Sequence, residues 1–212
     1  LKARRKGAPV TIFRLGEVMP SADNGCPNRQ ALTHFLLSAF YRLGVCPMAA
    51  MRSDYTPVDY VAARVAAAVS DRALWGRTLH VFHSESVCFS DVLARIGTHV
   101  TRVSCTDFLV RLDQAVHETR QRDLVTLRAL LPQGARDEVM LQQAFSRLLT
   151  DNPRLFLKEN CRKLERRWGM ADEWLNGAIS AYRDYLEDHA GQSPRLGADV
   201  SREVIRHSFI SM

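Results

Sequence analysis

Long apolar runs and paired cysteines are both missing from this 212-residue chain. No apolar run approaches the roughly 20 residues that a membrane-spanning helix needs, so we expect no membrane association. The five cysteines are an odd number and contain no CxxC pair, which argues against a disulfide framework and against a zinc site. No signal-peptide pattern opens the chain. We therefore expect a cytoplasmic protein without a bound metal ion.

Several catalytic motifs are missing as well. The chain contains no G-x-x-G-x-x-G turn for a dinucleotide pyrophosphate and no G-x-S-x-G nucleophile motif. Its seven histidines are scattered. His80 and His83 fall on a predicted strand and its exit, so they face opposite ways and do not suit a shared metal. No catalytic residue is assigned within the chain on this basis.

Negative charge is in the minority, because 29 Lys and Arg residues face 23 Asp and Glu residues and the net charge is +6. The basic residues cluster in segments 2–6 and 158–167. Neither cluster is interleaved with aromatic residues or set in a DNA-binding motif, so we expect no nucleic-acid partner. A basic face suits an acidic protein partner, and a solvated helix face explains the same charges.

The most informative stretch is a short run of β-branched and aromatic residues at 10–13, bounded by Pro9 and Gly16. Such a run predicts a strand buried on both faces, as in a parallel sheet. Ligands of such sheets bind outside the carboxyl ends of the strands, which draws attention to the loop at residues 14–20. The alternative is an ordinary core strand with no site at its end.

Helices and further strands follow along the chain. Apolar residues recur with a helical period in segments 30–43, 58–69 and 89–96, whereas 78–82 and 99–103 are predicted strands and 46–51 is a predicted apolar loop. Asn28 is expected to cap the first helix and Gly44 to end it. Thr56 is expected to cap the second helix, with Pro57 in its first turn.

From residue 106 onward the pattern predicts helices alone. They are expected at residues 108–116, 124–131, 139–149 and 171–186. Pro132 is expected to stop the second of them and Asp137 to cap the third. Residues 191–212 are polar and contain Gly and Pro, which predicts a loosely attached tail.

The order PVTIFRLG…DYTPVDYVA, over residues 9–62, resembles the late part of extended short-chain dehydrogenase/reductases. Within that group it looks most like the thioester reductase domains of nonribosomal peptide synthetases, polyketide synthases and carboxylic acid reductases. The likeness runs from Pro9 to about Asp107, and residues 156–160 with 178–186 resemble the family's closing segment. Arg14-Leu15-Gly16 stands where the family has Arg-Pro-Gly.

The resemblance implies an α/β fold, namely the late strands and helices of a Rossmann-type parallel sheet followed by a mainly helical C-terminal subdomain. Residues 1–105 would be the C-terminal part of the NADP-binding domain, 106–190 the helical subdomain facing substrate and carrier, and 191–212 the tail. The implied activity is NADPH-dependent reductive release of an acyl or peptidyl thioester as aldehyde or alcohol. The implied partners are a carrier protein with its phosphopantetheine arm and the upstream Rossmann half of the same domain.

The resemblance also implies site residues. Reductases of this kind use a Tyr with a Lys four residues later, and none of the five tyrosines here has that partner, so the catalytic pair is expected upstream. Cofactor binding is expected at the family's nicotinamide loop, whose matching positions are Leu15, Gly16, Glu17 and Val18. Substrate binding is expected at Met48, Met51 and Tyr55. Gly16 permits close approach of a ligand, although a plain turn explains it equally.

Two alternatives remain open. One is another extended reductase or epimerase, such as a fatty acyl reductase-like enzyme. The other is a non-catalytic helical interaction module that has kept the reductase scaffold. Binding of NADPH by the intact protein separates the second from the enzymes.

Overall fold

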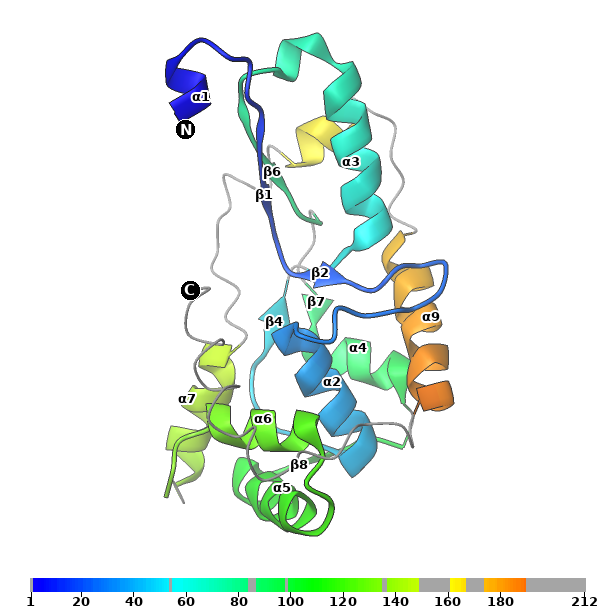
Figure 1. Cartoon of the computed structure of the whole chain (residues 1–212). Helices are drawn as coiled ribbons and strands as arrows, with labels where there is room; N and C mark the ends of the chain where they lie inside the picture. Colours follow the sequence, from blue (N-terminus) through cyan, green and yellow to red (C-terminus); the bar gives the residue numbers. More distant parts are fainter. Residues whose placement is uncertain are drawn as a thin grey trace.

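The computed structural model describes residues 2–53, 55–83, 87–97, 99–134, 137–148, 161–166 and 174–189. The predicted closing segment at 156–160 and the predicted tail at 191–212 lie outside these described residues. Figure 1 shows β1, β6 and α3 at one end of the molecule and α5, α6 and α7 at the other. No helix in the described ranges has the length and apolar character to cross a membrane.

A parallel pair of strands with one covering helix forms the first end. After the short helix α1 (Lys2–Arg5), β1 (Ile12–Leu15) pairs in parallel with β6 (Thr78–Val81). Helix α3 (Val58–Ser70) contributes Tyr60 and Val61 to a small core with Val81 and Phe13. The α/β prediction is therefore confirmed, although in the described residues the strands pair in twos.

Strand β1 corrects the predicted strand in two ways. It starts two residues later than expected and runs on through Leu15, because β6 supplies ladder partners up to Val81. The expectation of burial on both faces is wrong, because no residue of β1 is fully buried, Arg14 is exposed and Leu15 keeps 50% of its surface. Within the described residues β1 pairs with β6 alone, so one edge of β1 has no strand beside it.

A second parallel pair holds the loop after β1. Strand β2 (Val18–Met19) pairs with β5 (Thr56–Pro57), which leads directly into α3. The expected cap at Thr56 is wrong, because Pro57 is the N-cap residue and the Thr56 hydroxyl accepts a hydrogen bond from the His83 N–H at 2.9 Å. Thr56 thus joins β5 to the end of β6.

Helix α2 (Leu32–Leu43) ends at Gly44 as expected, with a positive φ of 63°. Its predicted cap is wrong: Ala31 is the N-cap residue, and Asn28 instead accepts from the Gln30 N–H at 3.0 Å in a local turn. The predicted apolar loop is also wrong where it begins, because β3 (Val45–Pro47) pairs in parallel with β8 (Thr101–Val103).

The remaining elements complete the helical end. They are η1 (Arg72–Leu74), the antiparallel pair β4 (Arg52–Ser53) and β7 (Val87–Cys88), α4 (Phe89–Ile96), α5 (Cys105–Thr119), α6 (Arg122–Leu130), α7 (Glu138–Leu148) and α9 (Trp174–His189). The described residues after 106 are thus helical in the main, as predicted. Residues 161–166 are helical as well.

The largest core joins these helices. Phe40 of α2 meets Phe89 of α4 and Phe108 of α5 edge to face, with ring centroids 5.6 and 5.2 Å apart, and Phe108 meets Phe145 of α7 in the same way at 5.4 Å. This core draws on residues from both sides of position 105. The division into domains at that position stays a prediction.

Candidate functional site

The loop after β1 is fixed by backbone hydrogen bonds to both neighbouring strands. The Gly16 N–H donates to the Val81 carbonyl at 3.2 Å, and the Thr56 N–H donates to the Glu17 carbonyl at 2.9 Å. Leu15 stays half exposed at the end of β1. The loop therefore presents an apolar side chain on a rigid backbone at the carboxyl end of a parallel strand.

Gly16 is explained by a contact inside the protein. A Cβ built on Gly16 would lie 2.8 Å from the Phe82 Cβ, which is closer than real Cβ contacts allow. Its φ lies outside the positive region, so this contact alone disfavours a side chain there. The contact accounts for the glycine without a ligand, and its role in cofactor binding stays a prediction.

The Glu17 side chain ties the loop to α2. Its carboxylate accepts from the Thr33 hydroxyl in a short hydrogen bond and from the Thr33 N–H at 3.4 Å. The helix lacks a capping side chain at Ala31, so Glu17 supplies the acceptor and the negative charge that a helix N-terminus favours. The predicted cofactor loop and the start of α2 are thus one connected unit.

A small recess opens between this loop and the helices α2 and α9. Its cavity volume is about 10 Å³, enough for roughly one water molecule. It is lined by Val18, Met19, Pro20, Pro27, Asn28, Ala31, Thr33, His34, Leu37 and Tyr182. Val18 is the predicted site residue that lines it.

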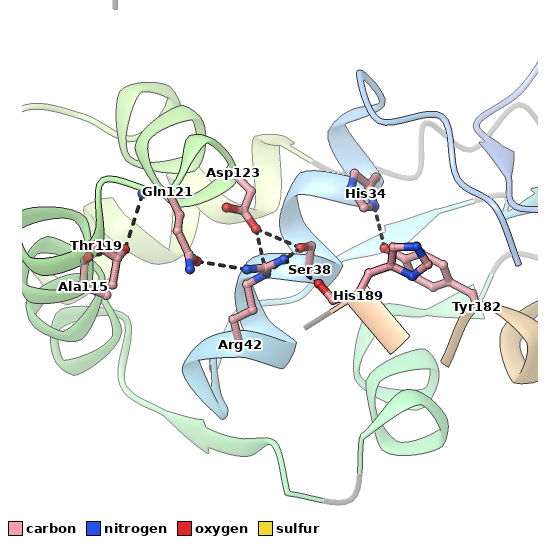
Figure 2. Close-up of polar contacts among 9 residues, drawn as sticks. All are labelled: His34, Ser38, Arg42, Ala115, Thr119, Gln121, Asp123, Tyr182 and His189. Atoms are coloured by element: carbon pink, nitrogen blue, oxygen red, sulfur yellow. Dashed lines mark hydrogen bonds and ion pairs between the residues drawn. The ribbon is translucent and has the colours of Figure 1, made fainter. Parts of the chain in front are cut away.

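His34 and Tyr182 form the polar wall of the recess. The His34 Nδ1 lies 2.7 Å from the Tyr182 hydroxyl, and the two rings meet edge to face (Figure 2). The pKa of His34 is lowered from 6.5 to about 4, chiefly by burial and to a smaller extent by the nearby Arg29 and Arg42, against the opposing effect of Asp123. The imidazole is therefore neutral at pH 7.

A buried polar network holds the helix that carries His34. Asp123 accepts from the Ser38 hydroxyl at 2.8 Å and pairs with the Arg42 guanidinium at 3.1 Å, and Arg42 also donates to Gln121 at 3.1 Å (Figure 2). Ser38 and Asp123 are buried. These contacts join α2 to the start of α6 and set the position of the α2 face that borders the recess.

The three predicted substrate residues lie in different surroundings. Met48 is 47% exposed just after β3, whereas Met51 and Tyr55 are buried in the largest core. The Tyr55 hydroxyl has no hydrogen-bond partner among the described residues, and burial raises its pKa well above the ordinary value. Their roles in substrate binding stay predictions.

Tyr60 belongs to a second buried cluster, away from the recess. Its ring lies under the Arg64 guanidinium, 4.4 Å from ring centroid to Cζ, and its hydroxyl accepts a short hydrogen bond from Arg64 and donates one to Glu165. Arg64 pairs with Glu165 at 2.9 Å. Burial and the bond to Glu165 raise the pKa of Tyr60. The cluster anchors residues 161–166 to α3.

Among the described residues, no group of His, Cys, Asp and Glu side chains suits a metal ion.

Sequence reasoning did not single out His34. The histidine precedes Leu37 by three residues on a predicted amphipathic helix, which gives no more than a position near the apolar face. Its partner Tyr182 is 148 residues away. No local pattern connects the two, so the pair emerges only when α9 packs beside α2.

Comparison with known proteins identifies a family model and solved structures that resemble this chain. Residues 1–65 match the model of an NAD-binding family described as male sterility protein. The chain also matches the terminal R domain from the myxalamid PKS-NRPS biosynthetic pathway, with a TM-score of 0.63 and 23% identity over 92% of this chain. A thiolation-reductase di-domain from an archaeal non-ribosomal peptide synthetase matches with a TM-score of 0.60 and 18% identity over 89% of this chain.

The chain has the fold of part of a terminal reductase domain. The resemblance to thioester reductases is thereby confirmed. The chain spans 47% of the first matched structure and 38% of the second. No curated protein matches it significantly.

Proposed function

We propose that this chain supplies the later half of the site of an NADPH-dependent thioester reductase. In the proposed reaction a carrier-bound acyl or peptidyl thioester gains a hydride at its carbonyl carbon and its C–S bond breaks. The acyl group leaves as an aldehyde, and the pantetheine sulfur takes a proton and leaves as a thiol. A second hydride and proton convert the aldehyde into an alcohol. NADPH, when bound, supplies the hydride and becomes NADP⁺.

The observation that carries the proposal is the exposed end of β1 within a reductase-like fold. Leu15 is half exposed on a backbone fixed by β6 and β5, and the recess begins at Val18 in the same loop. These features suit Leu15, Gly16, Glu17 and Val18 for holding the nicotinamide end of the cofactor. The helices α2 and α9 would exclude water beside it, and the catalytic Tyr and Lys are expected from the upstream Rossmann half.

The proposed partner is a carrier protein with a phosphopantetheine arm. The chain's net charge of +6 favours approach of an acidic protein. One of the matched structures is a thiolation-reductase di-domain, which supports a carrier domain as the partner. The substrate's acyl group and the choice between aldehyde and alcohol follow from product analysis.

Two matched variants of the intact protein test the role of the β1 loop. Leu15→Glu places a charge at the proposed nicotinamide contact, whereas Val69→Glu does the same at an apolar side chain of α3 that is 60% exposed. Leu15→Glu is expected to raise the KM for NADPH about tenfold, since desolvating a carboxylate against an apolar ring is unfavourable. Val69→Glu is expected to leave it unchanged. Equal values for the two variants would contradict the cofactor assignment.

A further inference from the structure

The recess beside Val18 is bordered by a histidine whose second ring nitrogen has no hydrogen-bond partner among the described residues. In the described part of the chain, the Tyr182 hydroxyl has one hydrogen-bond partner, the His34 Nδ1. A buried phenol satisfies its proton best by donating it, so Nδ1 of the neutral ring accepts and Nε2 carries the hydrogen. His34 lines the recess, and no described residue is bonded to its Nε2–H.

The side chains of the polar residues Thr33 and Asn28 in the lining make hydrogen bonds within the protein. The Thr33 hydroxyl donates to the Glu17 carboxylate. The Asn28 side-chain oxygen accepts from the Gln30 N–H at 3.0 Å, and Asn28 is exposed. The rest of the lining is apolar, from Val18 to Leu37. A small, mostly apolar recess bordered by the His34 N–H suits an uncharged acceptor oxygen.

The size and position of the recess further restrict which chemical group it can bind. Its volume of about 10 Å³ admits one oxygen atom and no chain. Val18 belongs both to its lining and to the proposed cofactor loop. An oxygen held there would belong to a molecule that lies along the end of β1.

We propose that the recess receives an amide carbonyl oxygen of the carrier-bound substrate, with the His34 Nε2–H as its donor and Tyr182 as the residue that orients the ring. This rests on the proposed function, in which a carrier-bound thioester reaches the end of β1. The amide belongs either to the pantetheine arm or to a peptidyl group, and both offer the same carbonyl chemistry. His34 contacts the substrate directly in this proposal, and Tyr182 is a positioning residue, because it acts through the His34 ring.

The test measures binding without turnover. The intact protein is titrated with a carrier whose thioester is replaced by a non-reducible amide. His34→Phe keeps a ring and removes the donor, and is expected to weaken binding about 3- to 10-fold, the usual worth of one neutral hydrogen bond. His34→Gln keeps an N–H near the Nε2 position and is expected to bind within about twofold of wild type. His117→Phe, on the exposed side of α5, is the control and is expected to bind as wild type does.

The same titration identifies the source of the oxygen. A loss in His34→Phe with the unloaded pantetheine carrier assigns the oxygen to the arm, and a loss only with the peptidyl carrier assigns it to the peptide. Unchanged binding of both carriers by His34→Phe would overturn the proposal and leave the recess as a water site. Absence of binding by the wild-type protein would overturn it too.

Two further measurements distinguish failure of this proposal from failure of the proposed reductase function. NADPH consumption by the wild-type protein on a carrier-bound thioester is followed in parallel. If the wild-type protein binds the carrier through His34 but consumes no NADPH, the reductase function is refuted and the role of His34 in the recess is supported. If His34→Phe unfolds at a much lower temperature than wild type, Tyr182→Phe takes its place. It keeps the buried ring and removes the orienting hydroxyl, and wild-type binding by that variant would overturn the role of the pair.

Discussion

Replacing Gly16 with alanine tests why the β1 loop needs a glycine. The added Cβ would lie 2.8 Å from the Phe82 Cβ, an atom fixed to the backbone rather than the far end of a flexible chain. Overpacking of this kind costs about 1–3 kcal/mol. For a domain of this size that loss lowers the melting temperature by roughly 2–4 °C per kcal/mol. NADPH affinity is expected to fall as well, because the loop backbone must shift to relieve the contact.

Gly134 provides the matched control for this substitution. It has a positive φ of 74° and no atom within 4 Å of a built Cβ, so Gly134→Ala isolates the cost of the backbone conformation, about 1 kcal/mol. It lies between α6 and α7, so NADPH affinity should not change. Denaturant unfolding and NADPH titration of both variants give the comparison. Full stability in Gly16→Ala would refute the argument from Phe82.

Three further predictions concern Tyr55, Glu138 and the Arg64–Glu165 pair. Tyr55→Phe removes a buried hydroxyl without a described partner, so the melting temperature should stay unchanged or rise. If a ligand binds that hydroxyl, the KM for that ligand should rise instead. The pKa of Glu138 is lowered to about 2, chiefly by backbone N–H donors. Above pH 4.5 the wild-type protein should therefore be about 1–2 kcal/mol more stable to denaturant than Glu138→Gln. This difference should disappear as the pH falls toward 2. Arg64→Met should cost about 3 kcal/mol in the same assay by stranding Glu165, and adding Glu165→Leu should recover most of it.

Helices were predictable because their signal is local. In α4 the four apolar residues that set the helical period are the four buried ones, Phe89, Val92, Leu93 and Ile96, and the predicted bounds agree with the structure. A helix satisfies its hydrogen bonds within itself, so its own sequence specifies where it lies.

Strands were predictable only in part because each takes its hydrogen bonds from a distant partner. Cys46 pairs with Arg102, which turns the beginning of an apolar loop into β3, and the bounds of β1 follow those of β6. Long-range pairing also decides Thr56, whose hydroxyl serves His83 instead of capping a helix. The single sequence carries no local record of these partners.

The candidate site was also predictable only in part. A strand, a following glycine and the rule for parallel sheets directed attention to the loop at Leu15 and Gly16, which the structure places at the carboxyl end of β1. The recess was not predictable, because Val18, His34 and Tyr182 come from three separate parts of the chain. Packing of α9 beside α2 brings them together.

The central claim is tested most directly by mixing the intact protein, NADPH and a carrier-bound thioester, and measuring NADPH consumption together with the mass of the released product. The account predicts one NADPH consumed for each acyl group released as aldehyde, or two for each alcohol, and a loss of this activity in Leu15→Glu at limiting NADPH. Binding of the carrier without any NADPH consumption would contradict the account and indicate an interaction module instead.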